Sequence, residues 1–207
     1  MRNIKFFTAI LISLMPFSQI RVFLYRTILK YKINKSFIGW LSVIAIRDVY
    51  IKNSYIGKFN LFKGNFKLVV NENVSIDKFN FFISGSWADS NSKFKQIIII
   101  GKDVLITKQH YFDICGEINI GESSVIGGIK SQFWTHGSLK EDFNIHIGNN
   151  CYISSGVKFA PGSLINNKTL VALGSVVINK FTEEKILIGG NPAKILKTNI
   201  YWKDLWV

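Results

Sequence analysis

The amino-acid sequence predicts an all-β fold, a parallel β-helix of hexapeptide repeats, with N-terminal α-helices and a short C-terminal extension. Three observations lead to this prediction. Large apolar residues recur at every sixth position, the composition suits a packed core, and the first stretch of the chain lacks the repeat. With 207 residues, 48% of them hydrophobic and 19% charged, the chain is long enough for one domain with a sizeable core.

The net charge of +13 favours anionic partners such as nucleic acid, an anionic membrane or phosphorylated ligands. A general preference for lysine explains it equally well, because the lysines are scattered rather than clustered. Cys115 and Cys151 are too few for a disulfide framework and lie within apolar repeat units. We therefore expect reduced, buried thiols and a cytoplasmic protein.

Residues 1–36 predict a helical segment. After a basic start, an apolar run extends from Phe6 to Leu14 as in a signal peptide, but no cleavage site with small residues follows. The run is shorter than the roughly 20 residues that a membrane-spanning helix needs. We expect a short helix here and a second one beyond a break near Pro16.

The second helix is expected to be amphipathic and basic over residues 19–35. Its apolar side is predicted to consist of Ile20, Leu24, Ile28 and Tyr31. The two helices either cap one end of the repeat domain or attach peripherally to an anionic membrane surface. We expect the 19–35 helix to cover the domain end and the Phe6–Leu14 run to contact lipid.

The hexad count begins at residue 38. The residues predicted to point inward are Ile38, Ile44, Tyr50, Ile56, Phe62, Leu68 and Val74, then Ile100, Ile106, Phe112, Ile118, Ile120 and Ile126, and finally Ile147, Ile153, Phe159, Ile165, Val171 and Val177. A helix with a period of 3.6 cannot keep one side apolar on a period of six. A parallel β-helix can, because each hexad forms a short strand with a turn and three hexads close one coil. Each coil buries its core only against its neighbours, so both ends need caps.

The count predicts the β-helix over residues 37–190 and a C-terminal extension over 191–207, which covers the other end or a neighbouring subunit. It is interrupted twice, near 80–96 and near 133–144. Insertions into a repeat fold form loops on one side, and loops carry function more often than the elements that they connect. The second insertion contains His136, within the stretch "SQFWTHGSL".

The hexads, of the form [LIV]-[GAED]-x-x-[STAV]-x, and the closing sequence "GGNPAKILK" at 189–197 resemble the left-handed β-helix acyltransferases. The N-terminal "LMPFSQIRVFLYR" resembles the lead-in of a subgroup of polysaccharide O-acetyltransferases. The resemblance implies a left-handed coil, a homotrimer and direct acetyl transfer from acetyl-CoA, with no metal and no nucleic acid. The acceptor that it implies is a hydroxyl of a surface polysaccharide, such as capsule or O-antigen, or of its lipid-linked sugar precursor. Residence in the cytoplasm, or peripherally at the inner face of the cytoplasmic membrane, would follow.

Acetyl transfer from a thioester to a hydroxyl needs a base, and histidine is the commonest one because its ordinary pKa lies near the operating pH. In the resembled family a loop histidine has this role, and His136 is the matching position. The residues predicted to bind the acceptor beside it are Trp134, Asp113, His110 and Gln132. Phe133, Trp87 and Asp89 are further candidates, with weaker support.

Three alternatives stay open. The protein could acetylate an amino sugar on nitrogen, or it could be a non-catalytic hexapeptide scaffold. The three histidines, His110, His136 and His146, also suggest a zinc site across a subunit interface, as in the γ-class carbonic anhydrases, although their spacings differ from that family's pattern.

The resemblance also implies a donor groove between two β-helices of a trimer. By hexad matching, its residues are Tyr152, Ser154, Ser155, Gly156, Ala172, Leu173 and Gly174. The phosphates of coenzyme A are expected to contact Lys180, Lys194 and Lys197, since lysine acts as a flexible point charge for phosphate. No Gly-rich loop that opens a helix is present, so nothing supports nucleoside triphosphate chemistry.

Overall fold

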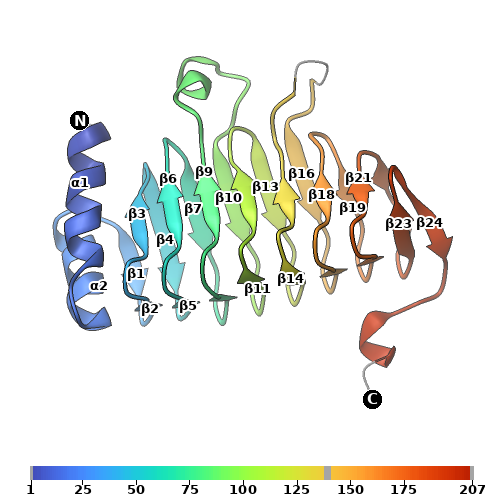
Figure 1. Ribbon diagram of the computed structural model, residues 1–207, viewed down its shortest axis with the longest axis horizontal. Coiled ribbons are helices and arrows are strands. Elements are labelled where there is room, and N and C mark those ends of the chain that lie inside the picture. Colours follow the sequence, from blue (N-terminus) through green and yellow to red (C-terminus); the bar gives the residue numbers. More distant parts are fainter. Residues whose placement is uncertain (1, 138–140, 206–207) are drawn as a thin grey trace.

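The computed structural model describes residues 2–137 and 141–205, and it is a left-handed parallel β-helix with two α-helices at its N-terminal end (Figure 1). Its strands form three sheets that run along the long axis, here named A, B and C. In the order of the chain, each coil contributes one strand to A, one to B and one to C, and then returns to A. The hexad period therefore predicted the architecture correctly.

Within the described residues, sheet A contains β1 (Lys32–Asn34), β4 (Asp48–Lys52), β7 (Lys67–Val70), β10 (Ile97–Ile100), β13 (Glu117–Ile120), β16 (Asn144–Ile147), β19 (Leu164–Ile165) and β22 (Lys180–Phe181). Sheet B contains β2 (Phe37–Ile38), β5 (Tyr55–Ile56), β8 (Ser75–Ile76), β11 (Leu105–Lys108), β14 (Val125–Ile129), β17 (Tyr152–Ile153), β20 (Leu170–Val171), β23 (Leu187–Gly190) and β24 (Ala193–Lys197). Sheet C contains β3 (Val43–Ala45), β6 (Leu61–Lys63), β9 (Phe81–Ile83), β12 (Tyr111–Asp113), β15 (Gln132–Phe133), β18 (Lys158–Phe159) and β21 (Val176–Val177). Neighbouring strands pair in parallel, except that β24 runs antiparallel to β23.

The core is the inside of the prism. Phe62, Phe82, Phe112, Phe133 and Phe159 stack in one column beneath sheet C, with successive ring centroids 4.4, 4.5, 4.5 and 5.1 Å apart. Buried aliphatic side chains of sheets A and B fill the rest of the prism, and both cysteines are free and buried, as predicted. Because the core side chains of each coil pack on those of the next coil, each coil depends on its neighbours for its stability.

One predicted core residue was assigned wrongly. Tyr50 is 40% exposed, whereas Val49 and Ile51 on either side of it are buried. Strand β4 is five residues long, and its side chains alternate between the outside and the core. The longer strand shifts the inward position by one residue, which a strict count of six cannot show.

The two helices, α1 (Arg2–Ser13) and α2 (Ser18–Thr27), cover the first coil and break near Pro16 as predicted (Figure 1). The predicted buried side of the second helix was wrong. Ile20 and Ile28 are exposed, the helix ends at Thr27, and Tyr31 is buried outside it. Both helices contact the coil end, since Ala9 and Ile12 of α1 are buried in the same core. Covering the end is therefore not the task of the second helix alone.

The side that α2 buries is polar because the first coil presents unpaired backbone groups. The Arg21 guanidinium donates from Nε and Nη2 to the carbonyl of Ile38, at 2.9 and 2.8 Å. The hydroxyl of Tyr25 accepts from the amide of Ile44 and donates to the carbonyl of Ser42, both at 3.1 Å. Buried backbone groups need such partners, and apolar side chains cannot supply them. Ile20 and Phe23 of α2 consequently point outward, whereas Val22 and Leu24 are partly buried against the core.

Strand β24 pairs with the last parallel strand of sheet B, and the residues after it, 198–205, turn back along the coils. The indole of Trp202 donates to the carbonyl of Asn150 at 2.6 Å, and the hydroxyl of Tyr201 donates to the Asn150 side chain at 3.2 Å. Asn150 lies in the turn between sheets A and B. Among the described residues, no helix has the length and apolar character that crossing a bilayer requires.

Candidate active site

Both insertions leave the β-helix at the same corner, where the chain passes from sheet C to sheet A. Residues 84–96, with a short 3-10 helix at Ser86–Ser90, follow β9, and the described residues 134–137 and 141–143 of the second insertion follow β15. Both project to one side of the molecule (Figure 1). The coil between them turns this corner tightly through residues 114–116. Side chains from three successive coils therefore meet here.

His136 is held by a buried carboxylate at this corner. Its Nδ1 lies 2.8 Å from Oδ2 of Asp113, whose side chain is only 5% exposed, whereas the histidine side chain is 38% exposed. The backbone amide of Thr135 also donates to Oδ2, at 3.0 Å, and the Cys115 thiol donates to Oδ1, at 3.4 Å. An ionised carboxylate only accepts, so Nδ1 carries the proton toward Asp113 and the lone pair of Nε2 faces away from it.

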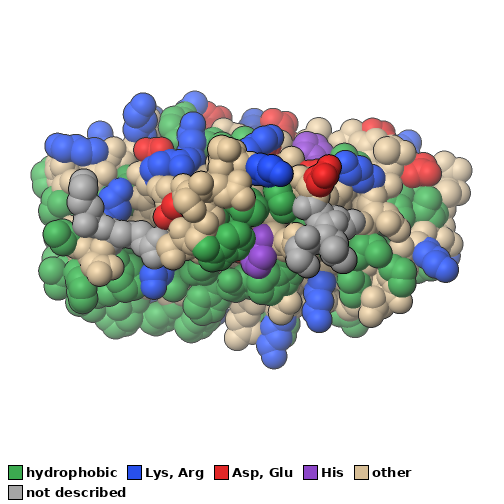
Figure 2. All heavy atoms as spheres, turned by 90° about the horizontal axis from the view of Figure 1, so that it is seen from above, with side chains coloured by type: hydrophobic (Ala, Val, Ile, Leu, Met, Phe, Trp, Pro, Cys, Tyr) green, Lys and Arg blue, Asp and Glu red, His purple; other side chains and the backbone are tan. Residues whose placement is uncertain are grey.

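Aromatic rings enclose the histidine. The ring centroid of Trp87, from the first insertion, lies 5.0 Å from that of His136, and that of Trp134 lies 6.0 Å from it, both edge to face. Phe94 packs against Trp87 at 5.2 Å and against Phe143 at 4.6 Å, which ties the two insertions together. Figure 2 looks onto this side of the molecule, and histidine (purple) reaches the surface there beside hydrophobic side chains (green).

The other predicted acceptor residues have different places. Gln132 is half-buried and accepts from the Trp134 indole at 3.1 Å, so it positions that ring. Asp113 is buried against His136 and positions the histidine. Phe133 belongs to the core column, which excludes it from the site. Asp89 accepts from the Gln96 amide at 2.9 Å within the first insertion.

His110 is not a site residue, contrary to the sequence-based prediction. It is fully buried, its Nδ1 accepts from the amide of Ser131 at 3.1 Å, and its Nε2 pairs with the Thr107 hydroxyl at 2.9 Å. Burial lowers its pKa to about 4, so it is neutral at pH 7. A satisfied, neutral histidine inside the fold has a structural role.

We expect this histidine to make the fold sensitive to acid. Its pKa is about 4 in the folded state and 6.5 ordinarily, so the unfolded chain binds the proton first as the pH falls. Its contribution is complete above pH 6.5 and is lost toward pH 4, with a loss of at most about 3 kcal/mol. Urea unfolding of the wild type and of His110→Asn between pH 7 and pH 4 measures it. Asn can still accept from Ser131, and the variant should lose part of the pH dependence. An equal loss in His146→Asn, which changes an exposed histidine, would contradict the assignment.

The three histidines do not form one cluster. His146 is exposed on β16, and His110 is buried. Among the described residues, one group could hold a metal ion, namely Asp113, Cys115 and His136, with ligand atoms within 4.8 Å of one another. Burial raises the pKa of the Cys115 thiol to about 12, so the thiol keeps its proton and donates to Asp113. In this state the carboxylate accepts hydrogen bonds from both Cys115 and His136.

The predicted donor residues lie at another corner, where the chain passes from sheet B to sheet C. Gly156 and Gly174 adopt φ angles of +69° and +70° in stacked turns of successive coils. Outside its chain neighbours, a Cβ atom added at Gly174 would meet no atom within 4 Å, and one added at Gly156 would meet only Gly174, at 3.9 Å. These turns thus expose bare backbone along an open strip. Leu173 beside it is 74% exposed.

The remaining donor predictions divide between two sheets. Ser154, Ser155 and Ala172 are half-buried near the glycine strip, and the half-buried Tyr152 packs on Trp202 of the tail at 5.2 Å. Lys194 and Lys197 are exposed on β24 of sheet B. Lys180 lies on sheet A and pairs with Asp142 of the second insertion at 2.8 Å. The structure therefore does not bring Lys180 together with the other two lysines in one chain.

Sequence reasoning missed two residues. The hydroxyl of Thr135 accepts from the amides of Cys115 and Gly116, at 3.0 and 2.8 Å, and so fastens the second insertion to the neighbouring coil. Cys115 was predicted only as a buried thiol of the core, yet it donates to the carboxylate of Asp113. The signal for Thr135 was its position directly before His136.

No family model matches the chain. The solved structure of the polysialic acid O-acetyltransferase OatWY is 22% identical in sequence, with a TM-score of 0.60 and 83% of each chain covered. That of the polySia-specific acetyltransferase NeuO is 17% identical, with a TM-score of 0.55 and the same coverage. A hexapeptide-repeat-containing acetyltransferase, VCA0836 from Vibrio cholerae, is 18% identical, with a TM-score of 0.50 over 96% of this chain and 90% of the other. At these identities the likeness extends to the fold, which is the parallel β-helix predicted from the hexads, with the left hand that the family resemblance implied.

Proposed function

We propose that this protein is an O-acetyltransferase that transfers the acetyl group of acetyl-CoA to a hydroxyl of a polysaccharide or of its sugar precursor. The observation that carries the proposal is the pairing of His136 with Asp113, half-exposed among aromatic rings at the corner where both insertions project. The two similar structures described as acting on polysialic acid support a polysaccharide acceptor.

The geometry suits general base catalysis with direct transfer. Nε2 of His136 takes the proton of the acceptor hydroxyl while its oxygen attacks the thioester carbonyl carbon. The bond from carbon to sulfur breaks as the new ester bond forms, and the imidazolium returns the proton to the leaving sulfur. Asp113 orients the ring and stabilises the imidazolium, as a carboxylate does when it faces the second ring nitrogen. Trp87 and Trp134 shield the reacting atoms from water.

The complete site is proposed to need a second copy of the chain, in a trimer. His136 lies at the corner where the chain passes from sheet C to sheet A. The glycine strip lies at the corner where the chain passes from sheet B to sheet C. In one chain the whole width of sheet C therefore separates them. A neighbouring subunit that places its glycine strip beside this His136 would complete the groove. Gly156 and Gly174 leave room there for the extended pantetheine arm.

The function is tested by acetyl transfer in vitro. Purified protein with acetyl-CoA and host glycan should release free thiol and raise the glycan mass by whole acetyl groups. Mild alkali should remove those groups, because an ester is labile where an amide is stable. Alkali-resistant groups would favour the alternative of N-acetylation. A protein that neither binds coenzyme A nor releases thiol would be the non-catalytic scaffold.

Peripheral contact with an anionic membrane is proposed for the helical end. Apolar side chains of both helices, and of the residues next to the helix ends, are exposed. They are Ile4, Phe7, Leu11, Leu14, Phe17, Ile20, Phe23 and Ile28. Basic residues such as Arg26 and Lys30 lie beside them. Apolar side chains flanked by cations are the pattern of interfacial helices.

The variant Phe7→Gln/Leu11→Gln should lose co-sedimentation with anionic vesicles and keep its fold. Both side chains are more than 60% exposed, at 66% and 63%, so their loss removes lipid contact and little internal packing. Leu105→Gln on sheet B, at 38% exposure, is the control and should sediment like the wild type. Vesicle binding that is unchanged in the double variant would contradict the contact.

A further inference from the structure

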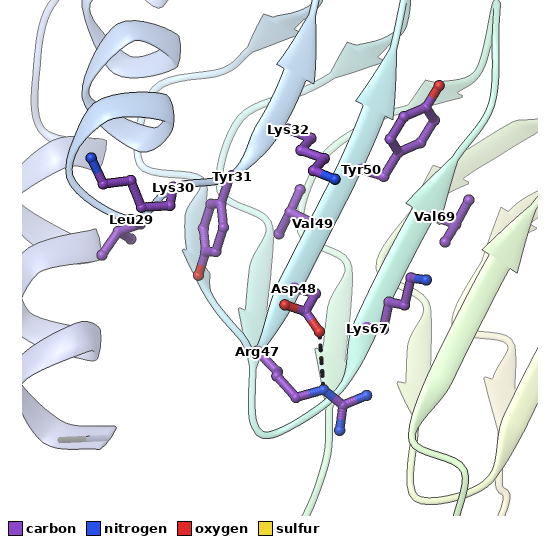
Figure 3. Close-up of a pocket in the computed structure, with 10 residues that line it drawn as sticks. All are labelled: Leu29, Lys30, Tyr31, Lys32, Arg47, Asp48, Val49, Tyr50, Lys67 and Val69. Carbon is purple, nitrogen blue, oxygen red and sulfur yellow. Dashed lines mark hydrogen bonds and ion pairs between the residues drawn. The ribbon is translucent and has the colours of Figure 1, made fainter.

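A cavity of about 420 Å³ lies between the end of α2 and the first three strands of sheet A (Figure 3). Its lining residues come from β1, β4 and β7, from the turn before β4 and from the segment after α2. They are Leu29, Lys30, Tyr31, Lys32, Arg47, Asp48, Val49, Tyr50, Lys67 and Val69. None of these side chains takes part in the proposed transfer of the acetyl group.

The lining is strongly cationic. It carries Lys30, Lys32, Arg47 and Lys67 against one carboxylate, Asp48, whose Oδ2 accepts from Nε of Arg47 at 3.2 Å. Among the described residues, the three lysines have no ion-pair partner. In Figure 3 the ammonium groups of Lys32 and Lys67 and the guanidinium of Arg47 lie around the same hollow. Cations gathered without partners attract an anionic ligand.

The same cavity offers a ring surface. Tyr50 is 40% exposed on β4, and Val69 lies beside it on β7. Tyr31 forms one wall, and its hydroxyl is held by donating to the carbonyl of Ile46 at 2.8 Å. An exposed aromatic ring among cations suits a sugar that carries an acidic group, since the ring packs on the apolar face of the sugar and the cations pair with the acid.

This cavity shares one lining residue with a hollow that reaches the first insertion. A second hollow, of about 410 Å³, is lined by Lys5, Arg47, Gly64, Asn65 and Asp89, among others, so Arg47 borders both. Asp89 belongs to the first insertion, two residues from the Trp87 ring that packs on His136. The two hollows thus extend from the helical end of sheet A to the first insertion, whose Trp87 packs on His136.

We propose that the acceptor is an anionic polysaccharide, and that sugars remote from the reacting hydroxyl bind in the cavity around Lys32, Arg47, Tyr50 and Lys67. This inference rests on the proposed function. A chain of several sugars can fill both hollows while one residue lies at His136. Binding energy from remote sugars then orients the reacting one, which an isolated monosaccharide cannot achieve.

The test measures binding apart from catalysis. Titration calorimetry at low and moderate salt should compare oligomers of sialic acid and of hyaluronan with maltohexaose, which is neutral. Wild-type protein should bind at least one anionic oligomer, more weakly at higher salt because the contacts are screened. Lys32→Glu/Lys67→Glu should weaken that binding about a hundredfold, on the expectation of roughly tenfold for each charge-assisted contact. The matched control Lys108→Glu, an exposed lysine on sheet B, should change it less than threefold.

Three results would overturn the inference. They are no detectable binding of either anionic oligomer, equal losses in the double variant and in Lys108→Glu, and a loss of anionic vesicle binding with glycan binding intact. The last result would assign the cavity to a lipid headgroup. Failure of the proposed function looks different, because a protein that binds the oligomers through these lysines without transferring acetyl groups would keep this site and lose the enzymatic activity.

Discussion

His136→Ala is expected to lower acetyl turnover by roughly 10²- to 10⁴-fold, the usual loss when a general base is removed. Affinity for coenzyme A should be nearly unchanged, because the proposed base acts on the acceptor hydroxyl, whereas the donor is proposed to be held by the glycine strip and the lysines. Turnover is measured as thiol release under saturating acetyl-CoA, and affinity by calorimetry. The folded state should survive, since the side chain is 38% exposed.

The variant Asp113→Asn tests the role of Asp113 in orienting the His136 ring, while the proposed base itself stays in place. The amide can donate to Nδ1, which would leave the proton on Nε2, the wrong nitrogen for a base. Turnover should fall by roughly 10²-fold or more, and the double variant should be no worse than His136→Ala, because the two residues act as a unit. His146→Ala is the control and should retain wild-type turnover. A His136→Ala enzyme with near wild-type turnover would remove the base from this corner.

The second large effect is recovery of activity by mixing two inactive variants. Gly174→Trp should abolish donor binding, since the added side chain would project into the open strip. His136→Ala lacks the base but keeps the strip. An interface is active when its strip comes from a His136→Ala chain and its histidine from a Gly174→Trp chain. In trimers that form at random from equal amounts of both chains, roughly one interface in four meets this condition. About a quarter of wild-type activity should therefore return.

Gly174→Asn is the control for backbone strain, because Asn tolerates the left-handed conformation that this turn requires. It should keep most of the donor affinity. Purified His136→Ala and Gly174→Trp should be mixed after separate folding and again after co-expression. Absence of recovery in co-expressed trimers would show that base and strip act within one chain, and would contradict the shared groove.

The fold was predictable because each six-residue unit forms one short strand and one turn, so the apolar residues that face the core recur at every sixth position. The insertions were predictable as interruptions of that count, and His136 as the histidine within one of them. The contact between His136 and Asp113 was not, because residues 23 positions apart meet only when two coils are stacked in register. Tyr50 and His110 were assigned wrongly for related reasons. The five-residue strand β4 moves the inward-facing position away from Tyr50. The sequence alone does not distinguish a buried histidine such as His110 from a catalytic one.

The N-terminal cap was predicted as a segment but not in its orientation. Amphipathic reasoning assumes that a helix buries its apolar side, whereas α2 buries Arg21 and Tyr25 to serve open backbone groups. The need for those partners arises from the coil end, which no pattern within the helix reveals. The cationic cavity escaped sequence reasoning similarly, since Lys32, Arg47 and Lys67 gather only through coil stacking.

The polar contacts of the cap also bear on self-association. A β-helix that ended in bare strand edges would be a template for another β-helix, and molecules could join end to end into fibres. Ser18, Arg21, Tyr25 and Tyr31 occupy the backbone groups on which such growth depends. At the other end, β24 reverses direction, so the last strand of sheet B offers no parallel neighbour to an incoming coil. The chain is thereby kept at a fixed length although its repeat has no intrinsic limit.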